Sequence, residues 1–447
     1  MRQIFDETTD PSFGARHLPL VRARMAEQGL DGLLVPHEDE HQNEYLPAAN
    51  DRLAWISGFT GSAGAGVVLR DRAAVFADGR YTVQVKAQVD PEQFEILDLV
   101  EGGVPAYLER APQGAVIGYD PRLHSPDALA TLKRAAAKAG AVLKPVDVNP
   151  LDQAWGEARP EQPRAPVVPH EDRYTGETAA SKRARIGAAV AEAGADAAVL
   201  TAPSSIAWLF NVRGGDVIRS PLPLGQAILR ADGTATLILD PAKVGNDLAA
   251  WLGDAVELKA PEALEAALAG LAGRKVLVDP AQSSAWYFDQ LEAAGATIVR
   301  GMDPCALPRA AKNPVEIEGT RQAHIRDGAA LTRFLHWVDT VAQHTLPDER
   351  EVAEALERFR EQTGALQDLS FDTIAGAGPN GALPHYKPVT RTLRRMEKGS
   401  LLLVDGGGQY LDGTTDVTRT MAVGQPSADQ RRMFTLVLKG HIAMATV

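Results

Sequence analysis

The hydrophobic and polar positions of this chain repeat one pattern in two places. Residues 20–36 alternate apolar and charged residues at helical spacing, reach a glycine and continue as an apolar run. This pattern is typical of an amphipathic helix followed by a buried strand. Residues 182–203 repeat it, and similar phrases follow, LAWISGFTG at 53–61 and IAWLFNVRG at 206–214, each leading into short β-like runs. Helices that alternate with strands predict two successive α/β domains.

In this repeat, Trp55 and Trp208 should occupy equivalent positions of the two domains. Two connecting stretches divide the chain into domains. The proline-rich stretch at 158–173 is expected to link the two α/β domains, and the stretch MDPCALPRAAKNP at 302–314 precedes a strong helix start. The predicted domains are therefore 1–157, 158–307 and 308–447.

The third domain mixes helices and strands in a different order. Apolar spacing predicts helices over about 314–341 and 348–363, then strands around 370–374 and 400–405. Asn313 can cap the first of these helices, because a proline follows it directly. The expected fold class is α/β and α+β: two α/β domains and a third domain of a different kind.

The last segment of the chain predicts a helix capped by Ser427. Apolar residues repeat at helical spacing through this segment, and the chain ends at Val447 without a glycine, a proline or a polar exit. We therefore expect a core-facing helix that has been cut off and a third domain that is incomplete. The apolar residues are Met433, Phe434, Val437, Leu438 and Ile442.

Composition narrows the class of protein. Apolar content of 45% and charged content of 23% are ordinary for a globular chain, and a net charge of −12 argues against a nucleic-acid partner. A single cysteine, Cys305, excludes an internal disulfide and a cysteine-based zinc cage, and no base lies beside it in the sequence. No apolar run approaches the ~18 residues of a membrane span. We expect a soluble, cytoplasmic protein without a membrane partner.

Two literal motifs invite functional interpretations that their surroundings do not favour. HEDEH at 37–41 matches H-E-x-x-H, but it follows a strand directly and has no apolar helical face, so a solvated polar loop or short helix is favoured over a zinc protease site. GAGPNG at 376–381 matches G-x-G-x-x-G, but Pro379 interrupts it and no helix can follow. A glycine-rich loop that admits a close neighbour is favoured there over a dinucleotide site.

The stretch VDGGGQYLDGTTDVTRT at 404–420 carries two carboxylates on one predicted hairpin. A turn centred on Asp412-Gly413 pairs Gln409 with Asp416, and Asp405 has the same parity as Gln409. Both aspartates should therefore share a face, although an ideal ladder leaves them ~13 Å apart along the strand. A bend at the three glycines could shorten this gap. The pattern is compatible with a metal site or with a solvated hairpin.

These residues resemble the catalytic domain of Xaa-Pro aminopeptidases (aminopeptidase P), a pita-bread metallopeptidase family that includes creatinase and prolidase. The resemblance rests on SFDTIAGAGPNGALPHYKP at 370–388 and LLLVDGGGQYLDGTTDVTRTM at 401–421. Further phrases resemble the two creatinase-like N-terminal domains and the start of the catalytic domain of its three-domain members. These phrases are WISGFTGSAGAGVV, ADGRYTVQ, SIAWLFNVRGGDV and KNPVEIEGTRQAHIRDGAAL.

The resemblance implies a set of site residues and cofactors. Asp405 and Asp416 match two of the family's five metal ligands, His385 matches its substrate-contacting, catalytic histidine, and Arg80 matches a substrate-binding arginine. It implies two divalent ions, manganese first, with zinc or cobalt as alternatives. The other ligands of the family, a histidine and two glutamates, are expected beyond Val447. On residues alone, a loop histidine without a chemical role is favoured for His385, and Arg80 could equally just pair with Asp78.

The function expected from this resemblance is metal-dependent removal of the first residue from Xaa-Pro peptides. The expected partners are peptides with proline at the second position and a second copy of the chain in a homodimer. With two of five ligands, the 447-residue chain itself is expected to be inactive. The alternatives are a prolidase- or creatinase-like hydrolase of the same fold and a non-catalytic peptide-binding protein.

Overall fold

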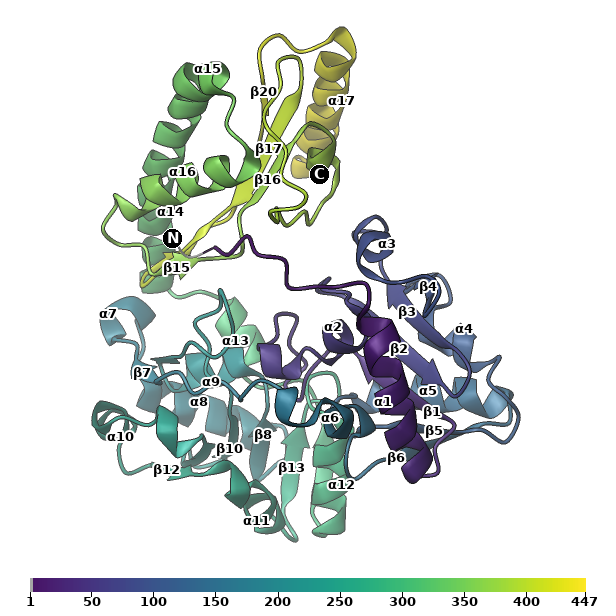
Figure 1. Cartoon of the computed structure of the whole chain (residues 1–447). Helices are drawn as coiled ribbons and strands as arrows, with labels where there is room; N and C mark the ends of the chain where they lie inside the picture. The colour runs from purple at the N-terminus through teal and green to yellow at the C-terminus, as the bar shows by residue number, and fades with distance from the viewer. Residues whose placement is uncertain (1–2) are drawn as a thin grey trace. The chain divides into compact units, whose positions relative to one another are not determined.

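The computed structural model describes residues 3–447, which form two compact units. One unit is Thr9–Val315, and the other joins Glu316–Val447 to the N-terminal residues up to Thr8. Figure 1 shows the elements of both.

The first half of the Thr9–Val315 unit is built on a six-stranded sheet with the order β4-β3-β2-β1-β5-β6. Strand β1 is antiparallel to β2 and parallel to β5. Its strands are β1 Gly32–Pro36, β2 Gly64–Leu69, β3 Ala73–Ala77, β4 Glu95–Asp98, β5 Val116–Tyr119 and β6 Val142–Pro145. Its α-helices are α1 Phe13–Glu27, α2 Arg52–Ser57, α3 Gln84–Gln88, α4 Gly103–Leu108, α5 Pro126–Lys138 and α6 Pro150–Trp155.

Burial on both faces explains why β1 reads as an uninterrupted apolar run. All five of its residues are buried, and side chains alternate between the two faces of a strand. Leu33 and Val35 accordingly pack into one hydrophobic cluster with α1, while Leu34 packs into a second cluster with α4 and α5. A sheet covered by helices on both faces produces this continuous pattern.

The second half repeats the first, with the strand order β12-β11-β10-β8-β13-β14. Its strands are β8 Ala197–Leu200, β10 Gln226–Arg230, β11 Ala235–Ile238, β12 Val256–Lys259, β13 Lys275–Val278 and β14 Thr297–Arg300. Its α-helices are α7 Asp172–Thr175, α8 Ala179–Glu192, α9 Pro203–Leu209, α10 Asn246–Leu252, α11 Leu264–Ala269, α12 Ala285–Ala293 and α13 Ala306–Ala310. A short antiparallel pair joins β7 Val168–Pro169, within the proline-rich stretch, to β9 Val212–Arg213.

The predicted repeat is present in the topology. Trp55 lies in α2 and Trp208 in α9, and each helix follows the first strand of its sheet. Each tryptophan packs, partly buried, against the core of its own half. The domain boundaries proposed at 157 and 307 stay a prediction.

The unit that contains residues 316–447 places helices against a three-stranded sheet of β16 Ile374–Ala377, β17 Leu401–Gly406 and β20 Val417–Ala422. Helices α14 Pro314–Trp337 and α16 Glu349–Glu361 contribute Phe334 and Leu356 to its core. Figure 1 shows these helices on one side of the strands and α17 Ala428–Ala445 on the other. A smaller sheet contains β15 Asp368–Leu369, β18 Gly408–Tyr410 and β19 Gly413–Thr414.

The helix starts predicted here are capped as their residues suggest. Asn313 accepts a hydrogen bond from the Val315 amide at 2.9 Å, and Ser427 forms a capping box with Gln430. The long helix α14 is shorter than expected, because a π-helical turn over Val338–Ala342 and the short α15, Gln343–Thr345, follow it. Helix α17 has no buried residue in the part of the chain that the structure describes, so its predicted core-facing role is not met here.

The N-terminal residues belong to this same unit, which sequence analysis did not foresee. The Gln3 side chain exchanges two hydrogen bonds with the Thr373 backbone, at 3.1 and 2.9 Å. Phe5 is buried in the core, and its carbonyl accepts from the Thr390 amide. Over residues 3–447, no helix is both long and apolar enough to cross a membrane.

Candidate metal centre

The two carboxylates of the predicted hairpin lie on paired strands, but in a different register from the one predicted. Asp405 pairs with Thr418 and Gln409 with Thr414, so the turn is centred on Leu411-Asp412. The prediction of a turn centred on Asp412-Gly413, with Gln409 opposite Asp416, is wrong: the turn lies one residue earlier, and the partner of Gln409 lies two residues earlier.

Contacts with α14 explain this register. The Asp412 carboxylate accepts two close hydrogen bonds from Arg326, at 3.1 and 2.5 Å. Gly413 packs so closely that an added Cβ would meet atoms of Ala323 and Thr320 at 3.1 Å. A helix far away in sequence therefore selects the turn, and local turn chemistry cannot reveal it.

The shift brings the aspartates closer together while keeping them on one face. The ladder places Asp416 opposite Gly407, which is two residues from Asp405. Side chains alternate between the two faces of a strand, so a shift of the strand pairing by two residues keeps both aspartates on the same face. It also halves their separation along the strand, from ~13 Å to about 7 Å. The shared face expected from sequence is present.

The hairpin also bends where the glycines lie. Strand β17 ends at Gly406 and β18 begins at Gly408, so the ladder is split between two sheets at Gly407. A Cβ on Gly407 would lie 1.8 Å from the Thr415 carbonyl oxygen and 2.3 Å from Ser370 Oγ. Only glycine allows the backbones to approach this closely.

Asp405 has the electrostatic surroundings of an incomplete site. Burial is the main cause that raises the pKa of its carboxyl; a hydrogen bond from Thr418 lowers it, and the charge and hydrogen-bonding proximity of Asp416 raise it. Among residues 3–447, the buried Asp405 Oδ1 has no hydrogen-bond partner. Two adjacent carboxylates, one with an unpartnered buried oxygen, are the arrangement that a divalent cation would stabilise.

His385 lies close enough to this pair that a positive charge on its imidazole would lower the pKa of the Asp405 carboxyl. It is half-buried and follows a 3₁₀ turn over Gly378–Ala382. The neighbouring Tyr386 hydroxyl donates to Glu349 Oε2 at 2.8 Å, and Asn380 Nδ2 donates to Glu349 Oε1 at 2.9 Å. Glu349 is fully buried at the start of α16 and thus fixes the loop that carries His385.

A second buried residue of α16 fixes the hairpin itself. Arg360 donates to both carboxylate oxygens of Asp327, at 2.8 and 3.3 Å, and to the Gly406 carbonyl at 2.9 Å. The Tyr410 hydroxyl also donates to Asp327, at 2.7 Å. Sequence analysis missed Glu349, Arg360 and Asp327; the signal was three charged residues on the inner faces of amphipathic helices.

The aspartates fit part of a metal site. Carboxylate oxygens are ligands that manganese, cobalt and zinc accept, and Asp405 keeps one oxygen without a hydrogen-bond partner among residues 3–447. Within the described residues, however, no cluster of three or more histidine, cysteine, aspartate or glutamate side chains could hold a metal ion. Asp405 and Asp416 therefore fit as a partial ligand set.

Arg80 belongs to the other unit, directly after β3. Its guanidinium pairs with the Asp78 carboxylate at 2.6 Å, and it lines a cavity of about 510 Å³ together with Glu44 and Ser62. The ion pair with Asp78 is present, and the substrate-binding role of Arg80 stays a prediction.

Neither literal motif forms the helix that the corresponding zinc or dinucleotide site would require. HEDEH forms an irregular loop rather than a helix, but it is not the solvated loop that we expected, because Asp39 is fully buried. The Asp39 carboxylate accepts from the His41 amide and from Asn43 and Asn50. GAGPNG leads into the 3₁₀ turn, and a Cβ on Gly376 would meet Gly381 Cα at 2.7 Å. It is a close-packed loop, as predicted.

Comparisons with protein families cover most of the chain. Residues 18–152 and 158–316 each match a Creatinase/Prolidase N-terminal domain, and residues 318–447 match Metallopeptidase family M24. This agrees with the expected fold class of two creatinase-like α/β domains followed by a pita-bread domain.

Two similar proteins carry the same name. Probable Xaa-Pro aminopeptidase P from Neurospora crassa is 36% identical over 465 residues, which cover 100% of this chain and 67% of that protein. Its counterpart from Chaetomium globosum is 37% identical over 96% of this chain and 72% of its own length. Whether the chain is truncated stays a prediction.

A solved structure is also similar across the whole fold. X-prolyl aminopeptidase from Caenorhabditis elegans, described as a cytosolic enzyme with a di-nuclear active site, matches with a TM-score of 0.89 and 27% identity. The match covers 96% of this chain and 73% of that one. From its relatives and its M24 domain, this chain belongs to the Xaa-Pro aminopeptidase P family of metal-dependent aminopeptidases, as its motifs predicted.

Proposed function

We propose that this protein removes the first residue from peptides with proline at the second position, and that Asp405 and Asp416 supply part of the ligand set for two divalent metal ions. The observation that carries the proposal is the approach of these carboxylates on one face, with Asp405 Oδ1 buried and unpartnered within the described residues. The di-nuclear site of the nematode relative supports the number of ions.

Metal ions and individual side chains would have separate roles in the reaction. Bound metal ions would polarise the substrate carbonyl and lower the pKa of a bound water. His385 would donate a hydrogen bond to the carbonyl oxygen of the first residue as negative charge develops there. Arg80 is a further substrate-binding candidate, on the strength of its motif alone. Burial of Glu349 and Arg360 keeps the His385 loop and the Asp405 strand in place during turnover.

Manganese is the first choice of metal, with zinc and cobalt as alternatives, because all three accept carboxylate and imidazole ligands. The direct test is thermal stabilisation by each ion. Manganese should raise the Tm of the unsubstituted chain, and Asp405→Asn or Asp416→Asn should abolish this rise. Asp429→Asn, an exposed change on α17, is the matched control and should leave it intact. An equal rise in all four proteins would refute the ligand assignment.

Turnover distinguishes the proposed enzyme from its alternatives. An Xaa-Pro aminopeptidase cleaves a tripeptide such as Ala-Pro-Ala after the first residue, whereas a prolidase-like enzyme prefers the dipeptide Ala-Pro. A binding protein would bind the tripeptide without cleaving it. His385→Asn should lower kcat by about a hundredfold, the scale of one oxyanion contact. The same assay tests the expectation that the 447-residue chain is inactive.

We also propose that the protein works in the cytosol as a homodimer. The description of the nematode relative as a cytosolic enzyme supports the location. Light scattering coupled to size-exclusion chromatography should report a mass near twice 47.7 kDa. A monomer mass at all concentrations would contradict the dimer.

A further inference from the structure

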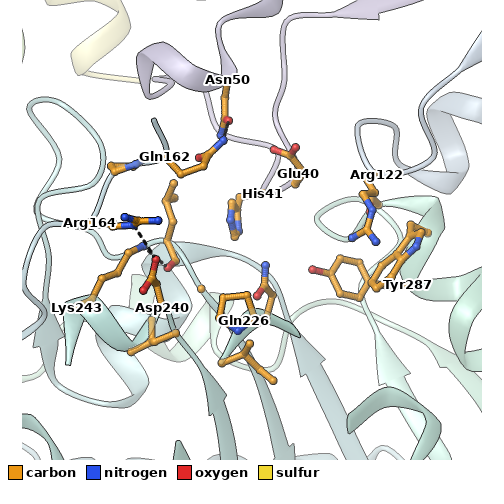
Figure 2. Close-up of a pocket in the computed structure, with 18 residues that line it drawn as sticks. Glu40, His41, Asn50, Arg122, Gln162, Arg164, Gln226, Asp240, Lys243 and Tyr287 are labelled. Atoms are coloured by element: carbon orange, nitrogen blue, oxygen red, sulfur yellow. Dashed lines mark hydrogen bonds and ion pairs between the residues drawn. The ribbon is translucent and has the colours of Figure 1, made fainter. Parts of the chain in front are cut away.

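A cavity of about 360 Å³ lies between the two α/β halves of the Thr9–Val315 unit. Figure 2 shows the polar side chains that gather around it. Glu40 and Arg122 come from the first half, Gln226 and Tyr287 from the second, and Arg164 from the proline-rich stretch that joins them. The volume lies at the lower end of the range for small-molecule sites.

One end of this cavity holds opposite charges that are not paired with each other. Glu40 and Arg122 both act on the buried Tyr287: burial raises the pKa of its hydroxyl, Arg122 lowers it, and Glu40 raises it further. In Figure 2, Arg122 lies above the Tyr287 ring, and Glu40 lies above His41. A positive and a negative group thus face one space from its two sides.

Their protein partners leave both groups able to bind a ligand. Arg122 stacks on Trp286, with its guanidinium carbon 3.8 Å from the ring centroid, and its nearest carboxylate, Glu265, is 3.4 Å away and exposed. One Glu40 oxygen accepts from Arg52 at 2.9 Å. Neither arrangement uses the full hydrogen-bonding capacity of a guanidinium or a carboxylate.

The neutral groups at this end are also incompletely satisfied. Ser284 is fully buried and lines the cavity, yet within residues 3–447 its Oγ has no hydrogen-bond partner. It occupies the N-cap position of α12 without capping that helix. His41 Nδ1 is bonded to the Thr201 carbonyl at 3.1 Å, which leaves Nε2 for a ligand. A buried hydroxyl without a partner is costly, so a bound molecule or water should meet it.

The other end of the cavity is internally neutralised. Asp240 pairs with Arg164 at 3.1 Å, and Lys243 pairs with the buried Asp216 at 2.8 Å. The groups with unused hydrogen-bonding capacity are therefore concentrated around Glu40, Arg122 and Ser284.

We propose that this cavity binds a small zwitterion, an α-amino acid or a dipeptide, with its carboxylate at Arg122 and Ser284 and its ammonium group at Glu40. A simple anion would be repelled by Glu40, and a simple cation by Arg122. The positive end of the α12 dipole adds to the preference for a carboxylate beside Ser284. The site is additional to the proposed metal centre, whose residues belong to the other unit.

The test is calorimetric titration with L-alanine and L-alanyl-L-alanine, in buffer with a chelator so that no metal-dependent site contributes. We expect saturable binding of at least one of them. The N-acetyl analogue lacks the ammonium group and the amide analogue lacks the carboxylate, and each should bind at least about tenfold more weakly.

Matched variants distinguish a loss of ligand recognition from a general loss of protein stability. Glu40→Gln should weaken binding at least about tenfold, whereas Asp152→Asn should not, although it also removes a carboxylate partner of Arg52. Arg122→Gln should weaken binding similarly, whereas Arg300→Gln should not, although Arg300 also lies over an aromatic ring, that of Phe288.

Two further comparisons test whether Ser284 contacts the ligand and whether the binding signal comes from the proposed metal centre. Ser284→Ala should weaken binding, whereas Ser283→Ala removes a buried hydroxyl that is already bonded to Thr201 and should not. Asp405→Asn should leave binding unchanged, and loss in that variant would assign the signal to the metal centre. No saturable binding, equal binding of the blocked analogues, or binding of inorganic phosphate alone would each overturn the proposal.

Discussion

Asp405 shows how the meaning of a residue depends on its backbone neighbours. Its carboxylate can approach Asp416 because Gly407, opposite Asp416, leaves room for two strands to come unusually close. A side chain at this position would meet backbone rather than a movable side chain, so relief requires the hairpin itself to shift. The geometry of the proposed metal centre therefore depends on a residue that carries no chemistry.

Gly407→Ala should destabilise the unit that contains it by about 2–4 kcal/mol, since its Cβ would lie 1.8 Å from the Thr415 carbonyl oxygen. Chemical unfolding measures this loss. The control is Gly328→Ala within α14, where an added Cβ meets nothing within 4 Å and should stabilise by about 0.5–1 kcal/mol. Equal effects at the two glycines would contradict the close approach.

His124 predicts a pH dependence in the other unit. Burial lowers the pKa of its imidazole from 6.5 to about 4, and its Nε2 has no partner among the described residues. Between these two values the unfolded chain binds a proton that the folded chain excludes, so stability is lost as pH falls from 6.5 towards 4. The loss amounts to roughly 3 kcal/mol at about 1.4 kcal/mol per pH unit.

Unfolding of the 447-residue chain in urea at several pH values measures this slope. His124→Asn should flatten the curve between pH 4 and 6.5, whereas His324→Asn, an exposed change on α14, should not. An unchanged slope in the His124 variant would show that other groups cause the acid sensitivity.

At the scale of elements, α16 is the part that organises the centre. Its first residue, Glu349, holds the loop of His385, and its last turn carries Arg360, which binds the Gly406 carbonyl beside Asp405. One rigid helix thus fixes two separate pieces of the site. Sequence periodicity places this helix to within about two residues at each end, but it cannot show its Asp348 cap or which buried charges find partners across the fold.

Arg360→Met should cost about 3–5 kcal/mol, because it leaves the Asp327 carboxylate buried without its ion-pair partner. Adding Asp327→Leu should recover part of this loss, and the double-mutant cycle isolates the coupling between the pair. Amide hydrogen exchange at Gly406–Gly408 should accelerate in Arg360→Met. Additive losses without faster exchange would show that the pair does not fix the hairpin.

The same scale marks the limits of prediction from sequence. The repeated α/β halves, the helix caps and the shared face of Asp405 and Asp416 follow from local periodicity and turn chemistry. The hairpin register, the burial of Asp39 and the attachment of Phe5 do not, since each depends on a partner that is remote in sequence. Local patterns determine elements, whereas tertiary contacts determine the register between them.

At the scale of the whole molecule, the apolar residues of α17 are the largest departure from a covered core. Phe434 is 52% exposed and Val437 is 70% exposed, and neighbouring residues of the helix share this exposure. Contiguous apolar surface of this kind promotes association. The 447-residue chain should therefore self-associate as its concentration rises, beyond any specific dimer.

Light scattering over a concentration series tests this expectation, with Phe434→Glu/Leu438→Glu as the informative variant. Replacing two apolar side chains by charges should suppress association, because the new carboxylates repel and the apolar area falls. Thr435→Glu on the same helix adds a charge without removing apolar surface, and it should have a smaller effect. If Thr435→Glu suppresses association as strongly as the double variant, net charge rather than the α17 face controls it.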